Sequence, residues 1–505
     1  MQFTILDCYT DEPSGLGVPP YLGTYPRYIT GALVQAKQKY QYITIDDLRF
    51  YVKHIIEGKK KVHKEKQIKT DIKTYNLTKH NKNIRQILEK TNYLIIIAGE
   101  HTPGKYLSAI PGTTTEVKAL LSKLQTVPKT ILTGPAVYGS GLYGGGKTKI
   151  ETGFDYSIAN LAIKLKTLLK NDFQDYEEAF DYKKIQKLSI LGAELINLHP
   201  SYPNAMLEIE TAIGCSRKNH CSFCLEPVKH RFELRDTKDI IAEIKALSKH
   251  GAKNFRLGKQ SDFFSRSEKD IEKLLKNAAK YSEILHIDNI NPANVTENKV
   301  KLVVKYCTEG NIAALGQESF DKAVIKANNL NSDPETTYKA IKIINKYGVV
   351  KGENGMSKFL PGINLLFGLI GETKDTHKEN MKWLTKILDN NLLLRRINIR
   401  QVAQFPQTKI FGENKAIRKN KKYYWKWRNE IRQNIDVQML KRLVPTGTIL
   451  VQVQTEIYDG NTTFTRQLGT YPLVIGIKER LPLNKFYKIK ITKHMLRSVT
   501  GEVVN

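Results

Sequence analysis

Six short apolar runs, each followed by an amphipathic segment, succeed one another from Ala205 to about residue 430. The runs have the composition of buried parallel strands, and segments such as Ile240 to His250 and Thr336 to Tyr347 have helical spacing. No Gly-x-Gly-x-x-Gly fingerprint accompanies them, which favours a partial (β/α)6 barrel over an open doubly wound sheet. The predicted strands are Met206 to Glu210, Asn254 to Leu257, Ile284 to Asp288, Ile312 to Leu315, Ile363 to Leu369 and Arg396 to Val402.

The barrel is flanked by two segments of different character, so we predict an α/β protein of three domains. Residues 1–185 alternate short strands and helices, as in a Rossmann-like parallel layer, and end in a largely helical bridge from Tyr156 to Tyr182. Residues 190–435 form the partial barrel. Residues 440–505 contain short alternating strands and a Gly460-Asn461 turn without a helix, which predicts a small all-β barrel.

Three of the five cysteines, Cys215, Cys221 and Cys224, lie within ten positions directly after the first barrel strand. Loops at the carboxyl ends of barrel strands are where barrel enzymes place their chemistry. Three thiolates can bind three irons of a [4Fe–4S] cubane and leave the fourth iron open. The rival interpretation is zinc held by these cysteines with His220 or His230, although no second ligand pair follows Cys224 at knuckle spacing.

The segment from Glu210 to Cys224, including the aromatic Phe223 before the last cysteine, resembles the cluster loop of radical S-adenosylmethionine (SAM) enzymes. The family's usual spacing is Cys-x3-Cys-x2-Cys, and this chain has two extra residues. Three further segments extend the resemblance over about residues 203 to 410: Gly316 to Ser319 with Asn328-Asn329, Phe367 to Thr373, and Phe405 to Thr408.

The resemblance implies an enzyme whose open iron binds SAM and whose reduced cluster cleaves it to a 5′-deoxyadenosyl radical. It makes Cys215, Cys221 and Cys224 both the metal ligands and the catalytic residues. The cofactor-binding residues it implies are Phe223, Gly258, Gln260, Asn291, Glu318, Ser319 and Arg400. Leu257-Gly258-Lys259-Gln260 stands where the family has Gly-Gly-Glu, and the polar residues of this set could equally be structural residues of the barrel interior.

The N-terminal part resembles the cobalamin-binding, Rossmann-like domain attached to many radical SAM enzymes. The similarity lies in Leu22-Gly23, Ile45-Asp46 and Thr133-Gly134-Pro135. The Asp-x-His-x-x-Gly motif that supplies a histidine to cobalt is missing. Relatives of this kind either bind cobalamin without that histidine or keep the fold without the cofactor, so cobalamin remains an open expectation.

Gly141-x4-Gly146-Lys147-Thr148 matches the Walker A pattern. A working P-loop follows a strand closely and begins a helix at its lysine, so that backbone amides cradle the phosphates. Here the preceding strand ends near Thr133, and Gly153 would interrupt the helix. A P-loop NTPase acting on RNA is therefore an alternative function, beside a loop without nucleotide.

The C-terminal barrel resembles the TRAM domain, a small RNA-binding barrel of tRNA methylthiotransferases. The similarity rests on Pro445-x-Gly447, on Arg466 after Thr463-Phe464-Thr465, and on Ser498 to Gly501. It implies that exposed Arg466, Lys488, Lys493, His494 and Arg497 contact RNA. A methylthiotransferase proper carries three more cysteines in its N-terminal domain, where this chain has only Cys8, so methylation or another radical modification is favoured.

Eighty basic and fifty acidic residues give the chain a formal charge of +30, which attracts polyanions such as RNA. The cations cluster in Lys59 to Lys90 and Lys415 to Arg442, where Tyr423, Tyr424, Trp425 and Trp427 either stack on bases or anchor a helix. No apolar run has the length of a membrane span, and no signal peptide pattern opens the chain, so we expect a cytoplasmic protein.

The sequence thus predicts an archaeal-type radical SAM enzyme that modifies a macromolecule, with tRNA or rRNA as the expected partner and ferredoxin or flavodoxin as the expected electron donor. The alternative from another class is an RNA-binding protein with a structural zinc or iron–sulfur site. Iron content and 5′-deoxyadenosine release under anaerobic reduction would distinguish the two.

Overall fold

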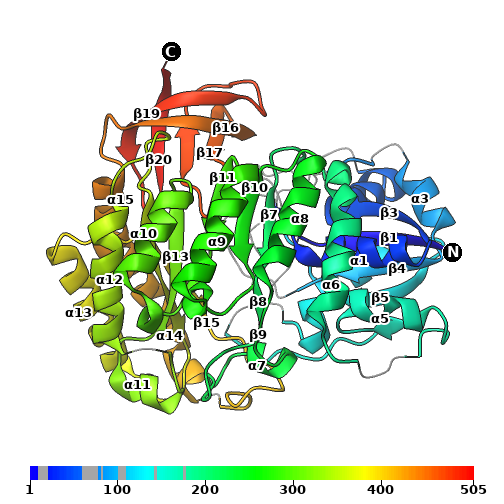
Figure 1. The fold of residues 1–505 in the computed structure, drawn as a ribbon, viewed down its shortest axis with the longest axis horizontal. Helices are drawn as coiled ribbons and strands as arrows, with labels where there is room; N and C mark the ends of the chain where they lie inside the picture. Colours follow the sequence, from blue (N-terminus) through cyan, green and yellow to red (C-terminus); the bar gives the residue numbers. More distant parts are fainter. Residues whose placement is uncertain are drawn as a thin grey trace. The chain divides into compact units, whose positions relative to one another are not determined.

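A computed structural model describes residues 1–9, 21–59, 78–80, 83–99, 110–141, 145–174, 178–331, 333–413 and 415–504 (Figure 1). Most of the Lys59 to Lys90 charge run lies outside these residues, as does part of the Gly141 to Thr148 loop. The chain divides into two compact units. The first comprises Met1–Tyr143, Thr148–Ile209 and Lys238–Asn254, and the second comprises Gly144–Lys147, Glu210–Thr237 and Phe255–Asn505.

The first unit is built on a five-stranded parallel sheet in the order β3-β1-β4-β5-β6 (Figure 1). β4, with the sequence Tyr-Leu-Ile-Ile-Ile, is buried along its whole length, as expected of a central parallel strand. The Rossmann-like fold predicted for this part of the chain is confirmed. The strands are β1 (Gln2–Asp7), β3 (Lys39–Thr44), β4 (Tyr93–Ile97), β5 (Lys129–Thr133) and β6 (Tyr156–Ser157).

Six helices accompany this sheet: α1 (Thr24–Gln35), α2 (Ile45–Phe50), α3 (Ile84–Lys90), α4 (Thr114–Leu121), α5 (Leu161–Leu168) and α6 (Tyr182–Leu191). α1 and α6 are packed unusually closely, because a Cβ atom on Gly31 would lie 2.0 Å from the Leu188 carbonyl oxygen. Short β2 (Tyr21–Leu22) pairs in parallel with β7 (Met206–Glu210). α8 (Thr237–Lys249) adds Glu243, whose carboxylate forms a fully buried ion pair with Arg27 of α1.

The helical bridge predicted from Tyr156 to Tyr182 is wrong at its start, which is strand β6 instead. Asp155 holds this strand in place, because its carboxylate accepts hydrogen bonds of 2.7 Å from both the backbone N–H and the hydroxyl of Thr130 in β5. Between β6 and α6 the described residues form one helix, α5. A two-residue edge strand is too short to give a periodic pattern in the sequence.

The second unit holds most of the partial barrel. β10 (Asn254–Gly258) lies beside β11 (Ile284–Ile287), and a parallel sheet runs in the order β12-β13-β14-β15. These strands alternate with helices along the chain, and the predicted (β/α) series is confirmed. The remaining elements are β12 (Asn289–Ile290), β13 (Asn311–Glu318), β14 (Phe359–Phe367), β15 (Arg396–Gln401), α9 (Glu268–Ala278), α10 (Glu297–Tyr306), α11 (Lys322–Ala327), α12 (Pro334–Gly348) and α13 (Lys374–Asp389).

The C-terminal part of the second unit is a closed barrel in the order β16-β17-β18-β20-β19, as predicted (Figure 1). Its core contains Leu450, Ile475, Ile489 and Ile491, and Leu440 and Leu443 of α15 pack against them. The last strand closes the barrel by pairing with β18 in parallel and with β19 antiparallel. The elements are α14 (Lys415–Ile431), α15 (Val437–Leu443), β16 (Ile449–Asp459), β17 (Thr462–Gln467), β18 (Val474–Ile477), β19 (Phe486–His494) and β20 (Ser498–Val504).

Candidate functional site

The three clustered cysteines lie on the loop between β8 (Ala212–Ile213) and α7 (Glu226–Lys229), directly after β7. All three are free thiols with partial solvent exposure. Gly214 leads into the loop with a φ of +67°, and a Cβ atom there would lie 2.7 Å from backbone atoms of His230 and Arg231. Only glycine fits both constraints, so the chain can turn into the cysteine loop at this point.

Arg217 places a positive charge against one of the three sulfurs. Its Nη1 donates to Cys221 Sγ at 3.1 Å, while its Nη2 donates to the Leu330 carbonyl at 3.1 Å. Burial raises the pKa of Cys221 to about 11, and the Arg217 guanidinium acts in the opposite direction. Because metal ligation requires the thiolate, Arg217 favours the form that would bind iron. Sequence reasoning missed this residue, although a cation between cysteine ligands is a signal that could have been used.

Asn328, just after α11, joins the cysteine loop to the turn that follows β14. Its Oδ1 lies 2.7 Å from Ser222 Oγ and accepts from the Ile370 N–H at 3.2 Å. Its Nδ2 donates to the carbonyls of Val324 and Ile370 at 2.9 and 2.8 Å, and its own carbonyl accepts from the Ser222 N–H. Asn328 is completely buried. One side chain therefore fixes the segment between Cys221 and Cys224.

The inner side of the cysteine loop is apolar. Cys221 and Phe223 pack against a buried cluster formed by Val324, Leu330, Leu369, Val402, Ile410 and Ile417. Burial also raises the pKa of Cys224 to about 12, and the nearby Glu226 carboxylate adds to the shift. Such surroundings exclude water from one side of the thiols, as an oxygen-sensitive cluster requires.

Several residues predicted to bind cofactor are already engaged within the barrel. Gly258 ends β10, and buried Gln260 accepts from Thr211 Oγ1 at 3.0 Å and donates to the Leu257 carbonyl at 3.1 Å. Asn291 uses its Oδ1 to accept from the Ala293 N–H at 2.9 Å. Ser319 Oγ accepts from the Asp321 N–H at 3.2 Å. Their side chains shape the strand ends, and their contacts to a cofactor stay predictions.

Glu318 and Arg400 are the polar pair at the carboxyl ends of β13 and β15. Glu318 has a φ of +59°, and burial raises its pKa to about 8, against the effect of the Arg400 guanidinium. The Nε of Arg400 is buried without a hydrogen-bond partner. A buried donor without a partner is costly, so this position suits an anionic group such as the carboxylate of a bound amino acid.

The described residues contain no group of three His, Cys, Asp or Glu side chains already arranged around a common metal position. The three thiols nevertheless share one loop, and each of Cys221 and Cys224 lies within electrostatic range of Cys215. Three free thiols with a cation beside them and an apolar inner side fit a cluster site. Their role as ligands stays a prediction.

The Gly-rich loop does not have P-loop geometry. The Gly145 N–H donates to the Val402 carbonyl at 3.1 Å, the Gln404 N–H donates to the Gly146 carbonyl at 2.9 Å, and Lys147 forms a parallel bridge with Gln404. No helix begins at Lys147, and the next described helix, α5, starts at Leu161. The described part of the loop therefore lacks the helix that a P-loop needs at its lysine, and the Gly145 N–H is already bonded to the segment after β15, so the structure gives the nucleotide-binding interpretation no support.

The expected RNA-contacting residues of the C-terminal barrel divide into two groups. Lys488, Lys493 and Arg497 are exposed, while His494 is partly buried with its Nε2 2.7 Å from the Val444 carbonyl. The prediction that Arg466 is exposed is wrong, because its side chain is only 2% exposed. Its Nε donates to Glu456 Oε1 at 2.6 Å. The bidentate ion pair ties β17 to β16 and occupies the guanidinium.

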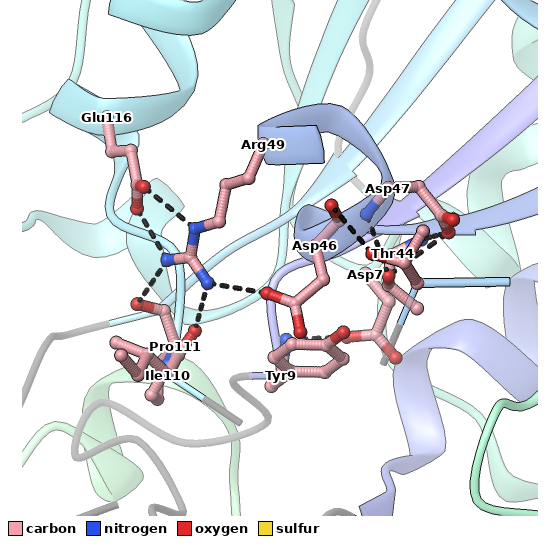
Figure 2. A network of polar contacts seen from close by, with 10 residues as sticks. Asp7, Tyr9, Thr44, Asp46, Asp47, Arg49, Ile110, Pro111 and Glu116 are labelled. Carbon is pink, nitrogen blue, oxygen red and sulfur yellow. Dashed lines mark hydrogen bonds and ion pairs between the residues drawn. The ribbon is translucent and has the colours of Figure 1, made fainter. Parts of the chain in front are cut away.

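In the first unit, the carboxyl ends of β1 and β3 carry a network of buried polar groups (Figure 2). Arg49 joins Asp46 and Glu116 and donates to the Ile110 carbonyl at 2.7 Å. Asp7 accepts from the Tyr9 N–H and from the Tyr42 hydroxyl, both at 2.8 Å. The carboxylates and Arg49 satisfy one another, which gives this part of the network a structural explanation, while the buried Tyr9 hydroxyl has no hydrogen-bond partner among the described residues.

No helix among the described residues is long and apolar enough to cross a membrane.

Comparisons with known proteins identify the family. The model of the radical SAM superfamily matches residues 209–384. An uncharacterized protein of Methanocaldococcus jannaschii is 42% identical over 99% of this chain and 93% of its own length. The ribosomal protein uS12 methylthiotransferase RimO of Elusimicrobium minutum is 25% identical over 68% of this chain and 75% of its own.

Among solved structures, the radical SAM methyltransferase TsrM of Kitasatospora setae, with cobalamin and a [4Fe–4S] cluster bound, has the same fold. The TM-score is 0.50 and the identity 10%, over 82% of this chain and 77% of TsrM. Motif, fold and relatives agree, and this chain belongs to the radical SAM superfamily: it is an enzyme whose family uses a [4Fe–4S] cluster and S-adenosylmethionine.

Proposed function

We propose that this enzyme holds its [4Fe–4S] cluster with Cys215, Cys221 and Cys224 and cleaves SAM reductively to modify RNA. The observation that carries the proposal is the cysteine loop itself. Asn328 holds this loop in place after β7, and the Arg217 guanidinium donates a hydrogen bond to the Cys221 sulfur. When reduced, the cluster with SAM supplies a 5′-deoxyadenosyl radical.

The chain's own residues prepare the site in three ways. Arg217 offsets the negative charge of Cys221, and Asn328 keeps the 221–224 segment rigid. Phe223 and the apolar cluster beside it exclude water from the inner side of the loop. Arg400 and Glu318 present a cation and a carboxyl group of raised pKa at the strand ends, where they would orient the charged amino-acid part of SAM.

RNA is supported as the substrate by charge and by the C-terminal barrel. The formal charge of +30 favours a polyanion, and Lys488, Lys493 and Arg497 are exposed on a barrel that resembles an RNA-binding domain. The relative RimO is by name a methylthiotransferase of a ribosomal protein, so a ribosomal protein is the second candidate substrate.

Anaerobic reconstitution tests the chemistry. We expect iron and sulfide to bind, and 5′-deoxyadenosine to appear when SAM and a reductant are added. Serine at Cys215, Cys221 or Cys224 should abolish both signals. Alanine at Cys307 is the matched control, because that thiol is buried and distant in sequence from the loop, and it should leave both intact. One bound zinc without iron would contradict the proposal.

The substrate is tested in a strain lacking the gene. Digested tRNA and rRNA from this strain and its parent are compared by mass spectrometry, together with the intact ribosomal proteins. Loss of one modified nucleoside supports RNA. A mass change confined to a ribosomal protein would replace RNA by the second candidate and leave the radical chemistry standing.

Cobalamin needs a separate measurement. TsrM was solved with cobalamin bound, and its fold is similar, so the cofactor is a reasonable addition to the reconstitution mixture. Retention of the corrinoid absorption after gel filtration would establish binding to this chain.

A further inference from the structure

Five arginines come together where β15, α14 and the hairpin between β19 and β20 meet in the second unit. Arg396 and Arg400 lie on β15, Arg428 lies on α14, Arg432 follows α14, and Arg497 lies in the hairpin. Arg396 is within electrostatic range of Arg400 and Arg432. Arg497 is within range of Arg396, Arg428 and Arg432. These five residues are called the arginine cluster below.

Few negative charges oppose the cluster. The carboxylates that act on it among the described residues are Asp436, ion-paired with Arg432, Asp288, ion-paired with Arg256, and Glu318 beside Arg400. Burial, followed by the neighbouring Arg432, lowers the pKa of Arg428, and burial is also the main cause of the lowered pKa of Arg396. Unbalanced charge of this kind costs stability, so an external anion is expected to offset it.

The cluster also contains hydrogen-bond donors without partners. The Nε atoms of Arg396, Arg400 and Arg432 are buried without a hydrogen-bond partner. The remaining contacts orient the side chains: Arg396 lies with its Cζ 4.1 Å from the Tyr471 ring centroid, and Arg432 Nη1 donates to the Ile397 carbonyl at 2.7 Å. Oriented guanidinium groups with free N–H donors suit phosphate, which they bind through parallel hydrogen bonds.

An exposed aromatic ring adjoins the cluster. Trp425 of α14 is 60% exposed, and the Cζ of Arg428 lies 5.2 Å from its ring centroid. Its neighbours Tyr424 and Trp427 are 8% and 6% exposed and pack inward, so they anchor the helix. Four aromatics were expected either to stack on bases or to anchor the helix. Tyr423 stacks on Trp427, with ring centroids 5.6 Å apart, and Trp425 has the exposed ring that is placed for stacking on a base.

We propose that Arg396, Arg428 and Arg497 of the arginine cluster, together with Trp425, form the surface that binds the RNA substrate. These three arginines contact phosphates of the backbone, and Trp425 stacks on an unpaired base. Arg432, which is 4% exposed and ion-paired with Asp436, adds positive charge beneath them. This inference rests on the proposed function and adds to it the residues that hold the substrate. A small free anion would need the guanidinium groups but not an exposed ring, and single-stranded RNA offers both phosphates and base faces.

Fluorescence anisotropy with a short labelled single-stranded RNA tests the surface in the full-length reconstituted enzyme. The double variant Arg428→Gln/Arg497→Gln removes two cations of the cluster and should lower the slope of log K against log salt by about 1.4, or ~0.7 per phosphate. Trp425→Ala should weaken binding about tenfold or more, since one stacked base contributes about 1–3 kcal/mol. Trp425→Phe should recover most of the affinity.

Arg418→Gln, on the exposed side of α14, and Arg480→Gln, on the C-terminal barrel, are the matched controls and should bind RNA like the parent protein. Circular dichroism melts of all variants establish that they fold. If the cluster and Trp425 variants bind RNA as tightly as the controls, or if the parent binds no RNA, the inference is overturned. Absence of 5′-deoxyadenosine from the parent enzyme, measured without RNA, would instead contradict the proposed function.

Discussion

At the scale of single residues, Asn328 connects the cysteine loop to the turn after β14 through its side-chain hydrogen bonds. Asn328→Ala leaves the Ile370 N–H and carbonyl and the Ser222 hydroxyl without partners in a buried place. We expect the free energy of unfolding to fall by about 2 kcal/mol or more, at ~1–3 kcal/mol per buried unsatisfied group. Urea unfolding of the reconstituted protein measures the loss, and bound iron should fall with it.

The control for that change is Asn277→Ala at the end of α9, which removes two exposed hydrogen bonds, one to the Lys273 carbonyl and one from Lys280 Nζ. It should alter stability by less than about 0.5 kcal/mol. Equal effects of the two substitutions would show that Asn328 is not the link between the cysteine loop and the turn after β14.

His286 makes stability depend on pH at the residue scale. Burial lowers its pKa to about 4, and its Nδ1 accepts from the Thr470 N–H at 3.2 Å, which fixes the neutral form. The Glu309 carboxylate and carbonyl act against this shift, and Arg256 supports it. The unfolded chain binds the proton below pH ~6.5, so stability should decline as the pH falls from ~6.5 toward 4.

His286→Gln removes this titration. Thermal melts between pH 7 and 5 should therefore show a flatter pH dependence for the variant than for the parent, whatever its absolute stability. His54, in the π-helical segment Tyr51–Ile56 that follows α2 in the first unit, is partly exposed, and His54→Gln serves as the control. An unchanged slope in His286→Gln would place the pH dependence elsewhere.

At the scale of secondary-structure elements, the contact between α1 and α6 depends on glycine. A Cβ atom at Gly31 would overlap the Leu188 carbonyl oxygen at 2.0 Å, and one at Gly192 would overlap the Arg27 carbonyl oxygen at 1.8 Å. Backbone cannot yield as a flexible side chain can. Gly31→Ala should therefore destabilise the protein by about 2 kcal/mol or more, despite the better helix propensity of alanine.

Urea unfolding measures this effect, and Gln35→Ala at the end of the same helix is the control. A Gly31→Ala variant that is as stable as the parent would mean that α1 and α6 can move apart to admit the added methyl group without a loss of stability.

The elements also show what the sequence could and could not predict. The strands of the barrel were predictable because parallel strands buried on both faces read as continuous apolar runs, and β7 begins and ends where the pattern places it. Strand β6 was not predicted because two residues are too few to show the alternation of a strand. Arg466 was wrongly predicted to be exposed. The sequence of a strand does not indicate whether an arginine side chain lies in solvent or forms a buried ion pair, as Arg466 does with Glu456. From the sequence, Asn328 was noted only as part of a segment that resembles the family. Its structural role was not predictable, because its hydrogen bonds join segments that are far apart in the chain.

At the scale of the whole molecule, the excess of positive charge acts against folding in the absence of a polyanion. A formal charge of +30 repels itself at low ionic strength, and salt screens that repulsion within a Debye length of about 10 Å at 0.1 M. We therefore expect the Tm of the RNA-free protein to rise as sodium chloride is added from low to moderate concentration. Differential scanning fluorimetry follows the shift.

Sucrose at matched osmolality separates screening from a general solute effect, because it stabilises folded proteins without screening charge. RNA should raise the Tm at low salt more than at high salt, since the same cations that repel one another in the free protein then face phosphate. A Tm that falls with added salt would mean that attractive pairs such as Arg27–Glu243 and Arg466–Glu456 outweigh the net charge, and the arginine cluster would then need no external anion to balance it.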